Sequence, residues 1–464
     1  MKTIKFKAIV ILFASIILCG ACKKEWLDAK PNKALVVPTT VADYQALLDN
    51  GFNPPIPMNT NMPSLSMVGD GDYYVTDATY NSLNYPPERG AYLWATTANF
   101  YDGQKNLEWI EAYQRILQDN VVLDGISSIK IDGTTQKAYN NVKGTALFFR
   151  SYDFYNLSQE YCRVYDASTA NTDLGLPLRL SSNINLTVTR SSVQQTYDQM
   201  INDLLQAAPL LPTSPLSTIR PSKPAVFALL ARVYLSQENY PKALLYADSC
   251  LQIQNGLMDF NQLSSNNYSP GIPRFNVETI FYAKLNSYTT FNKSVLIVDP
   301  ALLQLFASND LRTSTWFTTY AGNQTFWGTY YGDGSTPFGG IATDEMYLDR
   351  AECYARTGNV DLAMNDLNTL LKNRYKTGTF TNLTAANADD ALALIVKERR
   401  KELCFRNLRW SDLRRLNKDS RFQVTLTRNV NGQSYTLAPN SSRYVLPLDP
   451  IETTSGGLQQ NPRD

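Results

Sequence analysis

Apolar residues recur every three or four positions over long parts of the chain, a spacing that predicts amphipathic helices. The helical spacing covers residues 41–48, 107–123, 135–161, 192–205, 228–251, 347–371, 389–405 and 409–416. Thr39 or Thr40 can cap the first of these helices, because a threonine hydroxyl accepts a hydrogen bond from a free N–H of the first turn. We therefore expect a mainly α-helical fold with a few short strands.

Two of the helical segments, 228–251 and 347–371, resemble each other as helical hairpins. When they are aligned 120 positions apart, the matching pairs are Ala231 with Ala351, Tyr234 with Tyr354, Asn239 with Asn359, and Ala243 with Ala363. Small residues twelve positions apart allow two antiparallel helices to approach closely, which is the tetratricopeptide pattern. A chance likeness between two amphipathic hairpins is the alternative. The pattern predicts a tetratricopeptide-like helical-repeat core over about 105–255 and 343–417.

Two irregular regions interrupt this core, at about 51–104 and 256–342. Both are rich in aromatic residues together with Gly, Asn or Pro. They contain too many aromatic side chains for flexible linkers, so we expect ordered loop insertions. With a C-terminal tail at 418–464, they complete a single domain over 22–464.

The first residues have the features of an export signal. Lys2, Lys5 and Lys7 precede an apolar run over 8–18, which is too short to span a bilayer. Small residues then lead to Cys22, whose thiol would carry a lipid. We expect a lipoprotein signal peptide over 1–21 and lipid attachment at Cys22, with an ordinary secretory signal cleaved near Ala21 as the alternative. No later stretch is long and apolar enough to cross a membrane.

Composition excludes several functions. The chain has no histidine, which rules out Ser-His-Asp and Cys-His catalysis and histidine metal ligands. Its 43 basic and 42 acidic residues argue against nucleic-acid binding. We expect no cofactor and no metal site, because Asp70-Gly71-Asp72 lacks the ligand series of a calcium loop. Four cysteines, at positions 162, 250, 353 and 404, could form two disulfides or remain buried as free thiols.

A charged block near the C-terminus predicts ion pairs between helices. Glu402 and Arg406 are four residues apart, and Asp412 and Arg415 are three apart, so each pair can meet on a helix surface. We expect a solvated or partly packed network that joins two helices. Catalysis would require paired carboxylates in a cleft, and no pattern places Glu398 or Glu402 in one.

Several motifs together resemble the SusD/RagB family of surface lipoproteins. The matching segments are Cys22-Lys-Lys-Glu-Trp-Leu-Asp28, the helix with Trp109, Tyr113, Ile116 and Asn120, the block Lys397–Leu403 with Arg409–Arg414, and the tail Tyr444–Ile451 with Gln460–Pro462. They occur in the family's order and spread over nearly the whole chain.

The resemblance implies a SusD-like fold and a non-catalytic lipoprotein that is anchored in the outer membrane through its N-terminal lipid and faces outward. Such a protein binds a nutrient, usually an oligosaccharide, and delivers it to a SusC-like TonB-dependent transporter. Two other hypotheses stay open: a surface glycoside hydrolase with paired carboxylates, and a repeat scaffold that binds only protein partners. The sequence does not identify the ligand.

Aromatic residues in the two insertions are the candidates for ligand contact. A sugar ring has apolar faces that stack on Trp or Tyr, and binding residues tend to lie on loops held by a rigid scaffold. The candidate residues are Tyr74, Trp94, Trp316, Trp327, Tyr330 and Tyr331. The alternative for each is that it packs an insertion onto the helical core.

Overall fold

Helices dominate the fold, as the apolar spacing predicts. The computed structural model describes residues 38–50, 57–264, 266 and 269–463. The chain divides at Thr40, and every element below belongs to the second unit, Val41–Asp464. The predicted signal peptide and Cys22 lie outside the described residues. The longer helices are α3 (Val41–Asn50), α7 (Leu107–Ile126), α8 (Gln136–Tyr161), α9 (Val193–Ala207), α10 (Lys223–Ser236), α11 (Tyr240–Leu251), α14 (Thr343–Arg356), α15 (Val360–Leu371), α16 (Ala388–Glu402) and α17 (Arg409–Leu416).

Local sequence signals set several helix boundaries. At the start of α9, Ser192 and Gln195 form a capping box, in which each side chain accepts a hydrogen bond from the other residue's backbone N–H. Asn106 caps α7 by accepting a hydrogen bond from the N–H of Trp109. These bonds satisfy N–H groups that have no partner inside the helix, so the chain enters each helix at a defined residue.

The two hairpins predicted from the sequence are α10–α11 and α14–α15. Their four aligned alanines are all fully buried. The two turns have the same geometry: the N–H of Asn239 donates to the carbonyl of Tyr234 over 2.9 Å, and that of Asn359 to Tyr354 over 2.8 Å. Each asparagine is the N-cap of the second helix. The sequence likeness therefore reflects a shared backbone geometry.

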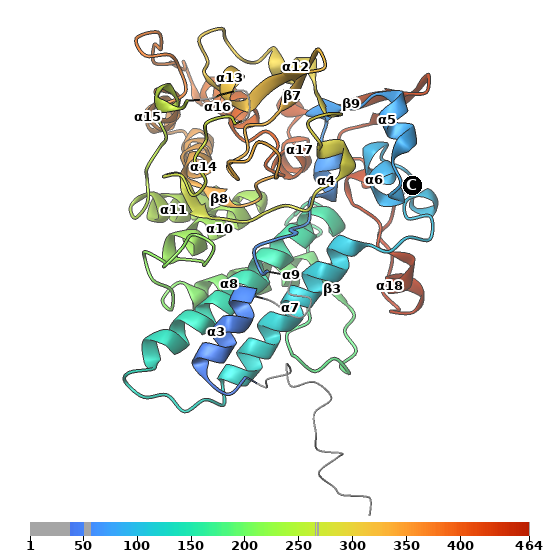
Figure 1. Ribbon diagram of the computed structural model, residues 1–464, viewed down its shortest axis with the longest axis vertical. Helices are drawn as coiled ribbons and strands as arrows, with labels where there is room; N and C mark the ends of the chain where they lie inside the picture. The colour runs from blue at the N-terminus through green and yellow to red at the C-terminus, as the bar shows by residue number, and fades with distance from the viewer. Residues whose placement is uncertain (1–37, 51–56, 265, 267–268, 464) are drawn as a thin grey trace, which may run out of the picture. The chain divides into compact units, whose positions relative to one another are not determined.

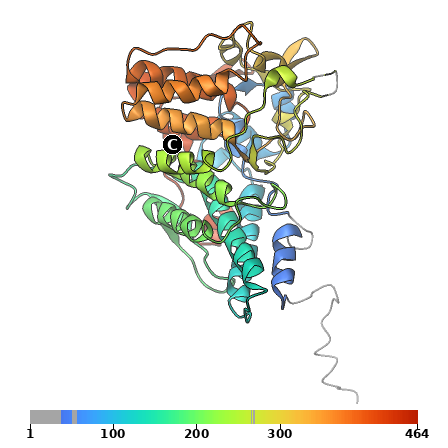
Figure 2. The same cartoon turned by 90° about the vertical axis from the view of Figure 1, so that its left-hand side faces the viewer.

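The helices pack in one continuous series. Each of α7 to α10 packs on the next in the chain, α10 packs on α11, and α11 packs directly on α14. The second hairpin thus stacks on the first although about 90 residues separate α11 from α14 in the chain. Figure 2 shows this stacking, with the orange helices of the second hairpin above the yellow-green helices of the first. The intervening insertion lies beside this series (Figure 1).

The strands described here form five two-stranded antiparallel sheets. They are β1 (Tyr73–Tyr74) with β5 (Ile297–Val298), β2 (Leu174–Pro177) with β3 (Arg190–Ser192), β4 (Thr279–Phe281) with β8 (Ile341–Ala342), β6 (Phe317–Tyr320) with β7 (Asn323–Phe326), and β9 (Leu426–Val430) with β10 (Gln433–Leu437). The pairing of β1 with β5 ties the first insertion to the second, with Tyr74 opposite Ile297.

The first insertion is more helical than the expected loop. It contains α4 (Leu65–Val68), α5 (Asp77–Ser82) and α6 (Pro86–Tyr92). Thr76 caps α5, and Pro86 stands at the first position of α6, where its missing N–H costs no hydrogen bond. These helices are too short for an apolar period to show. The remaining short helices are α12 (Pro300–Leu303), α13 (Arg312–Trp316) and α18 (Pro450–Thr454).

The four cysteines of this unit are free and buried, which agrees with the second of the two sequence alternatives. They lie at positions 162, 250, 353 and 404. Among the helices of the described residues, none is long and apolar enough to cross a membrane.

Candidate functional site: an aromatic groove

The six candidate aromatic residues fall into two groups. Trp94, Trp316, Trp327 and Tyr330 are buried, whereas Tyr331 is half-buried and Tyr74 is 39% exposed. A ring must present an accessible face to stack on a sugar. For the four buried residues, packing of an insertion onto the helical core is therefore the better interpretation. Tyr74 and Tyr331 remain candidates for ligand contact.

Trp316 and Tyr330 attach the second insertion to the helical core. The ring of Trp316 packs edge-on against Phe260 at 5.3 Å and lies 6.0 Å from the ring of Tyr330. The hydroxyl of Tyr330 donates to Glu278 and lies 3.1 Å from a carboxylate oxygen of Asp344 on α14. Both rings thus belong to the interior. Trp327 lines a small apolar cavity beside them, together with Phe326 and Phe405.

Trp94 has a comparable role in the first insertion. Its indole N–H donates to the carbonyl of Gly69 over 2.9 Å, and its ring belongs to a small core cluster with Trp410. Trp94 has a positive φ of 53°, which is uncommon for a bulky residue. The tryptophan therefore fixes the chain between α6 and α7, and it also lines the surface groove described below.

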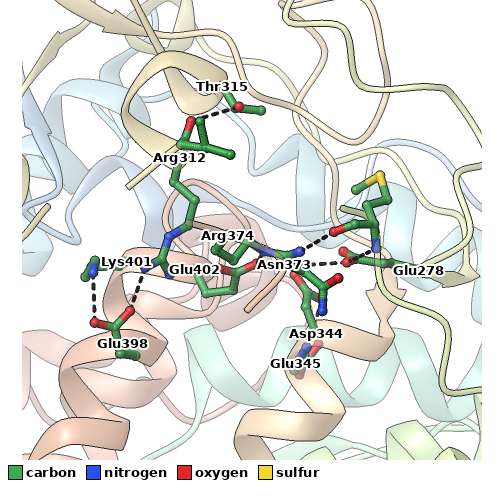
Figure 3. A network of polar contacts seen from close by, with 12 residues as sticks. Glu278, Arg312, Thr315, Asp344, Glu345, Asn373, Arg374, Glu398, Lys401 and Glu402 are labelled. Atoms are coloured by element: carbon green, nitrogen blue, oxygen red, sulfur yellow. Dashed lines mark hydrogen bonds and ion pairs between the residues drawn. The ribbon is translucent and has the colours of Figure 1, made fainter. Parts of the chain in front are cut away.

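A buried ion-pair network holds the same interface (Figure 3). Arg312 pairs with Asp310, Glu398 and Glu402, and Arg374 pairs with Glu278 and Glu402, over 2.7–2.9 Å. Lys401 pairs with Asp310 and Glu398. Glu402 thus lies between two guanidinium groups, one from the insertion and one that follows α15.

This network differs from the one expected from sequence. The predicted pair Glu402–Arg406 does not form, because α16 ends at Glu402 and the chain then turns through Phe405, whose φ is 59°. Arg406 pairs with Asp344 instead. The second predicted pair, Asp412 with Arg415, is present at 2.8 Å. The network is buried and joins the insertion to α14 and α16, so it is neither solvated nor limited to two helices.

Burial and charge shift the pKa values of these carboxyl groups in opposite directions. Burial raises the pKa of Glu278 to about 7 despite its pairing with Arg374. Burial acts in the same direction on Glu402, but Arg374 and Arg312 outweigh it and hold the pKa of Glu402 below its usual value. Glu402 is therefore an anion at neutral pH, whereas Glu278 can hold a proton there.

The described surface contains a groove between the first insertion and the C-terminal hairpin. It is lined by Tyr80, Pro86, Arg89, Gly90, Leu93, Trp94, Ala95, Thr96, Asn99, Asp102, Tyr435 and Arg443. Its volume of about 440 Å³ lies within the usual range of small-ligand sites. The rings of Tyr80 and Tyr435 are half-buried, so each is held firmly and still has an accessible face.

The hairpin β9–β10 positions Tyr435 in the groove. Asn431 and Gly432 both have positive φ values, 52° and 75°, as a tight two-residue hairpin turn requires. Tyr435 is the cross-strand partner of Arg428, so the two side chains share one face of the hairpin. The guanidinium of Arg428 lies 3.7 Å from the ring centroid of Tyr92, and the ring of Tyr80 lies 5.6 Å from Tyr92. This contact series anchors the hairpin on α5 and α6.

The groove combines flat apolar surfaces with hydrogen-bonding groups. Arg89 and Arg443 supply donors, Asn99 supplies both a donor and an acceptor, and Asp102 supplies acceptors. Tyr74 lies just before the helix that carries Tyr80. This combination suits a ligand with apolar faces and a rim of hydroxyl groups. Asp102 is the one acidic residue among the described groove-lining residues, whereas glycoside hydrolysis generally requires two carboxylates.

Sequence patterns alone do not predict this groove in full. Tyr435 is close to an Asn-Gly hairpin turn, which is a sequence signal, but nothing in the sequence places that hairpin beside Tyr80. Among the described residues, no group of three or more His, Cys, Asp or Glu side chains is arranged to hold a metal ion.

Comparison with known proteins identifies the family. A model described as "Starch-binding associating with outer membrane" matches residues 25–235, and the SusD family model matches residues 279–462. The comparison with curated proteins gives no match.

Solved structures have the same fold. A SusD superfamily protein from Bacteroides thetaiotaomicron matches with a TM-score of 0.71 at 21% identity, over 92% of this chain and 100% of that chain. A SusD-like carbohydrate binding protein from Bacteroides vulgatus matches with a TM-score of 0.68 at 22% identity, over 90% and 97% of the two chains. A SusD superfamily protein from Bacteroides fragilis has a TM-score of 0.68 at 19% identity, over 88% and 94%. With both family models matched in order, the chain belongs to the SusD/RagB family.

Proposed function

We propose that this protein is a non-catalytic surface lipoprotein that binds an oligosaccharide in the groove beside Tyr80 and Tyr435. The observation that carries the proposal is the groove itself, with two half-buried tyrosine rings flanked by Arg89, Asn99 and Asp102. A sugar can stack on a ring while its hydroxyls bind the polar groups. The carbohydrate-binding protein among its structural relatives supports the same ligand class.

The groove favours binding over hydrolysis. Among the described residues that line it, Asp102 has no second carboxylate opposite it. The acidic pair Glu398 and Glu402 lies in the interior, where Arg312 pairs with both carboxylates. We therefore expect the purified protein to bind a glycan without cleaving it.

The same proposal includes delivery to a SusC-like TonB-dependent transporter. An exposed apolar surface supports a protein partner: Ile184 is 70% exposed, and Leu180, Leu186 and Ile451 are also exposed. Ile184 lines a second groove with Trp109 and Leu458. Apolar residues that gather on a surface in this way are typical of a protein interface. Lipidation at Cys22 would hold the protein beside such a transporter in the outer membrane.

Purification of the native lipoprotein from membranes tests the proposal. Recovery of a TonB-dependent barrel with the protein supports the delivery role. Binding of a polysaccharide without release of reducing ends supports the binding role, and turnover of that polysaccharide contradicts it. Replacing Cys22 by Ser should release the protein from the membrane fraction, whereas retention there would contradict lipid anchoring.

A further inference from the structure

We propose that a second sugar-stacking site surrounds Arg274 and engages another part of the same glycan chain. The inference rests on the proposed function, because it assumes that the groove binds a glycan and adds a second contact with that glycan. The site is formed by Arg274, Phe275, Tyr282 and Tyr331, and is called the Arg274 platform below. It shares no residue with the groove.

The platform is a compact set of rings around one cation. The guanidinium carbon of Arg274 lies 4.7 Å from the ring centroid of Tyr331, 4.9 Å from that of Phe275 and 5.1 Å from that of Tyr282. The ring of Tyr282 lies 4.6 Å from Phe275 and 5.4 Å from Tyr331. Tyr282 is buried, so it forms the base on which the other two rings rest.

The outer face of the platform is open. Phe275 is 46% exposed, Arg274 is exposed and Tyr331 is half-buried. Phe275 also has a φ of 57°, in the left-handed region that a bulky side chain rarely adopts. A phenylalanine that only packs the loop would gain more by burying its ring. Backbone strain that holds a large aromatic ring at the surface is typical of ligand-contacting positions.

The platform is held in place by its surroundings. The side chain of Asn276 donates to the carbonyl of Pro273 and accepts from the N–H of Glu278. On the other side, Gly332 has a φ of 82°, and a Cβ there would lie 3.0 Å from the backbone nitrogen of Arg274. The two segments therefore approach more closely than a larger residue would permit. A rigid platform loses little conformational freedom when a ligand binds.

The chemistry of the platform fits a neutral sugar. Phe275 and Tyr331 offer ring faces for stacking, and the guanidinium of Arg274 carries hydrogen-bond donors for hydroxyl groups. Asp333 follows Tyr331 closely, and its carboxylate accepts hydrogen bonds from Ser335 and Thr336. This negative charge balances that of the Arg274 guanidinium, so the platform has no net charge with which to select an acidic sugar. We therefore assign the platform to a neutral unit of a polysaccharide.

Two sites on one protein change how binding depends on glycan length. When a polymer reaches both sites, the second contact is intramolecular and can raise the apparent affinity by about 10²–10⁴-fold. A fragment that is too short to reach both sites makes one contact only. The platform should therefore raise the affinity for a polysaccharide and leave the affinity of the groove for a short fragment unchanged.

Affinity electrophoresis of the purified protein tests this inference. The gels contain amylopectin, dextran, galactomannan, xyloglucan, arabinoxylan or galactan, and calorimetry uses a four-sugar fragment of whichever polymer retards the protein. We expect Phe275→Ala and Tyr331→Ala to weaken polymer binding by at least 10-fold and to change fragment binding less than twofold. Val277→Ala is the control, because Val277 is 55% exposed and is not part of the platform.

The outcomes separate the two proposals. If the parent protein binds none of these polymers, the proposed function is overturned and this inference with it. If the parent protein binds a polymer and Phe275→Ala and Tyr331→Ala bind it equally well, only the platform is overturned. Thermal unfolding of each variant identifies loss of folding, and Phe275→Tyr, which keeps a stacking ring, should retain polymer binding.

Discussion

The interior interface around Trp316 and the groove around Tyr435 are built from the same kinds of residue, but they differ in how the charges are used. In the interior, Arg312 and Arg374 are paired with carboxylates and the aromatic rings are buried. In the groove, Tyr80 and Tyr435 are half-buried beside polar groups that reach the surface. A segment rich in aromatic residues is therefore not by itself a binding site. At least one of its rings must also have a face that a ligand can reach.

The largest loss of folding stability is expected when the buried ion-pair network is broken. Replacing Glu402 by Ala leaves Arg312 and Arg374 with fewer buried partners, and loss of one member of a buried pair costs about 3–5 kcal/mol. Urea unfolding should show a loss of this size. The control is Arg421→Ala, whose pairs with Asp389 and Asp419 lie at the surface, so this variant should lose far less stability than Glu402→Ala. Equal losses of stability for the two variants would contradict the view that the buried position of the network makes it important for folding.

The pH dependence of stability tests the same interior. Burial raises the pKa of Glu278 from 4.5 to about 7, so the folded protein binds its proton more tightly than the unfolded chain does. The resulting stabilisation is complete below pH 4.5 and is lost as the pH rises through 7, by up to about 3 kcal/mol. Between pH 5 and 7.5, the unfolding free energy of Glu278→Gln should fall less steeply with pH than that of the parent protein. Burial also raises the pKa of Asp349 to about 7, so part of the slope should persist.

Substitutions in the groove should lower the affinity for the oligosaccharide and leave the stability of the fold unchanged. Replacing Tyr435 by Ala removes one stacking face, and such a contact contributes about 0.5–1.5 kcal/mol, or up to roughly a 10-fold change in affinity. Calorimetry with the bound oligosaccharide should show this loss. Tyr320→Ala is the matched control, because Tyr320 is an exposed tyrosine on a different hairpin. A Tyr435 variant with full affinity would exclude Tyr435 as a stacking ring.

The smallest effect is expected at Tyr74. This ring is 39% exposed and lies before α5, at the side of the first insertion. Its replacement by Ala should change stability by less than about 0.5 kcal/mol, since it removes little buried surface. If a longer oligosaccharide extends from the groove to this ring, affinity should fall about threefold, as measured by the same calorimetry. An unchanged affinity would confine the ligand to the groove.

The sequence predicts the helical core well, because long helices have a strong apolar period. The range predicted from 409 to 416 is that of α17, and the paired alanines of the two hairpins are buried as the repeat pattern requires. Short elements such as α4 and α5 were missed, because four to six residues are too few for a period to appear.

The candidate site was harder to predict, since burial of an aromatic side chain depends on tertiary packing. Trp316 and Tyr331 both lie in an aromatic-rich segment, yet one is in the core and the other is half-buried. Likewise, Glu402 and Arg406 have the spacing of a helical pair, but the helix ends between them. Sequence spacing predicts contacts inside an element and says little about contacts between distant segments.

A structure of the protein with a bound oligosaccharide tests whether the groove is the binding site. We expect a sugar ring stacked on Tyr80 or Tyr435, with hydroxyl groups hydrogen-bonded to Arg89, Asn99 or Asp102 and the interior around Trp316 unchanged. An oligosaccharide bound elsewhere, with both groove tyrosines free of ligand contact, would contradict it.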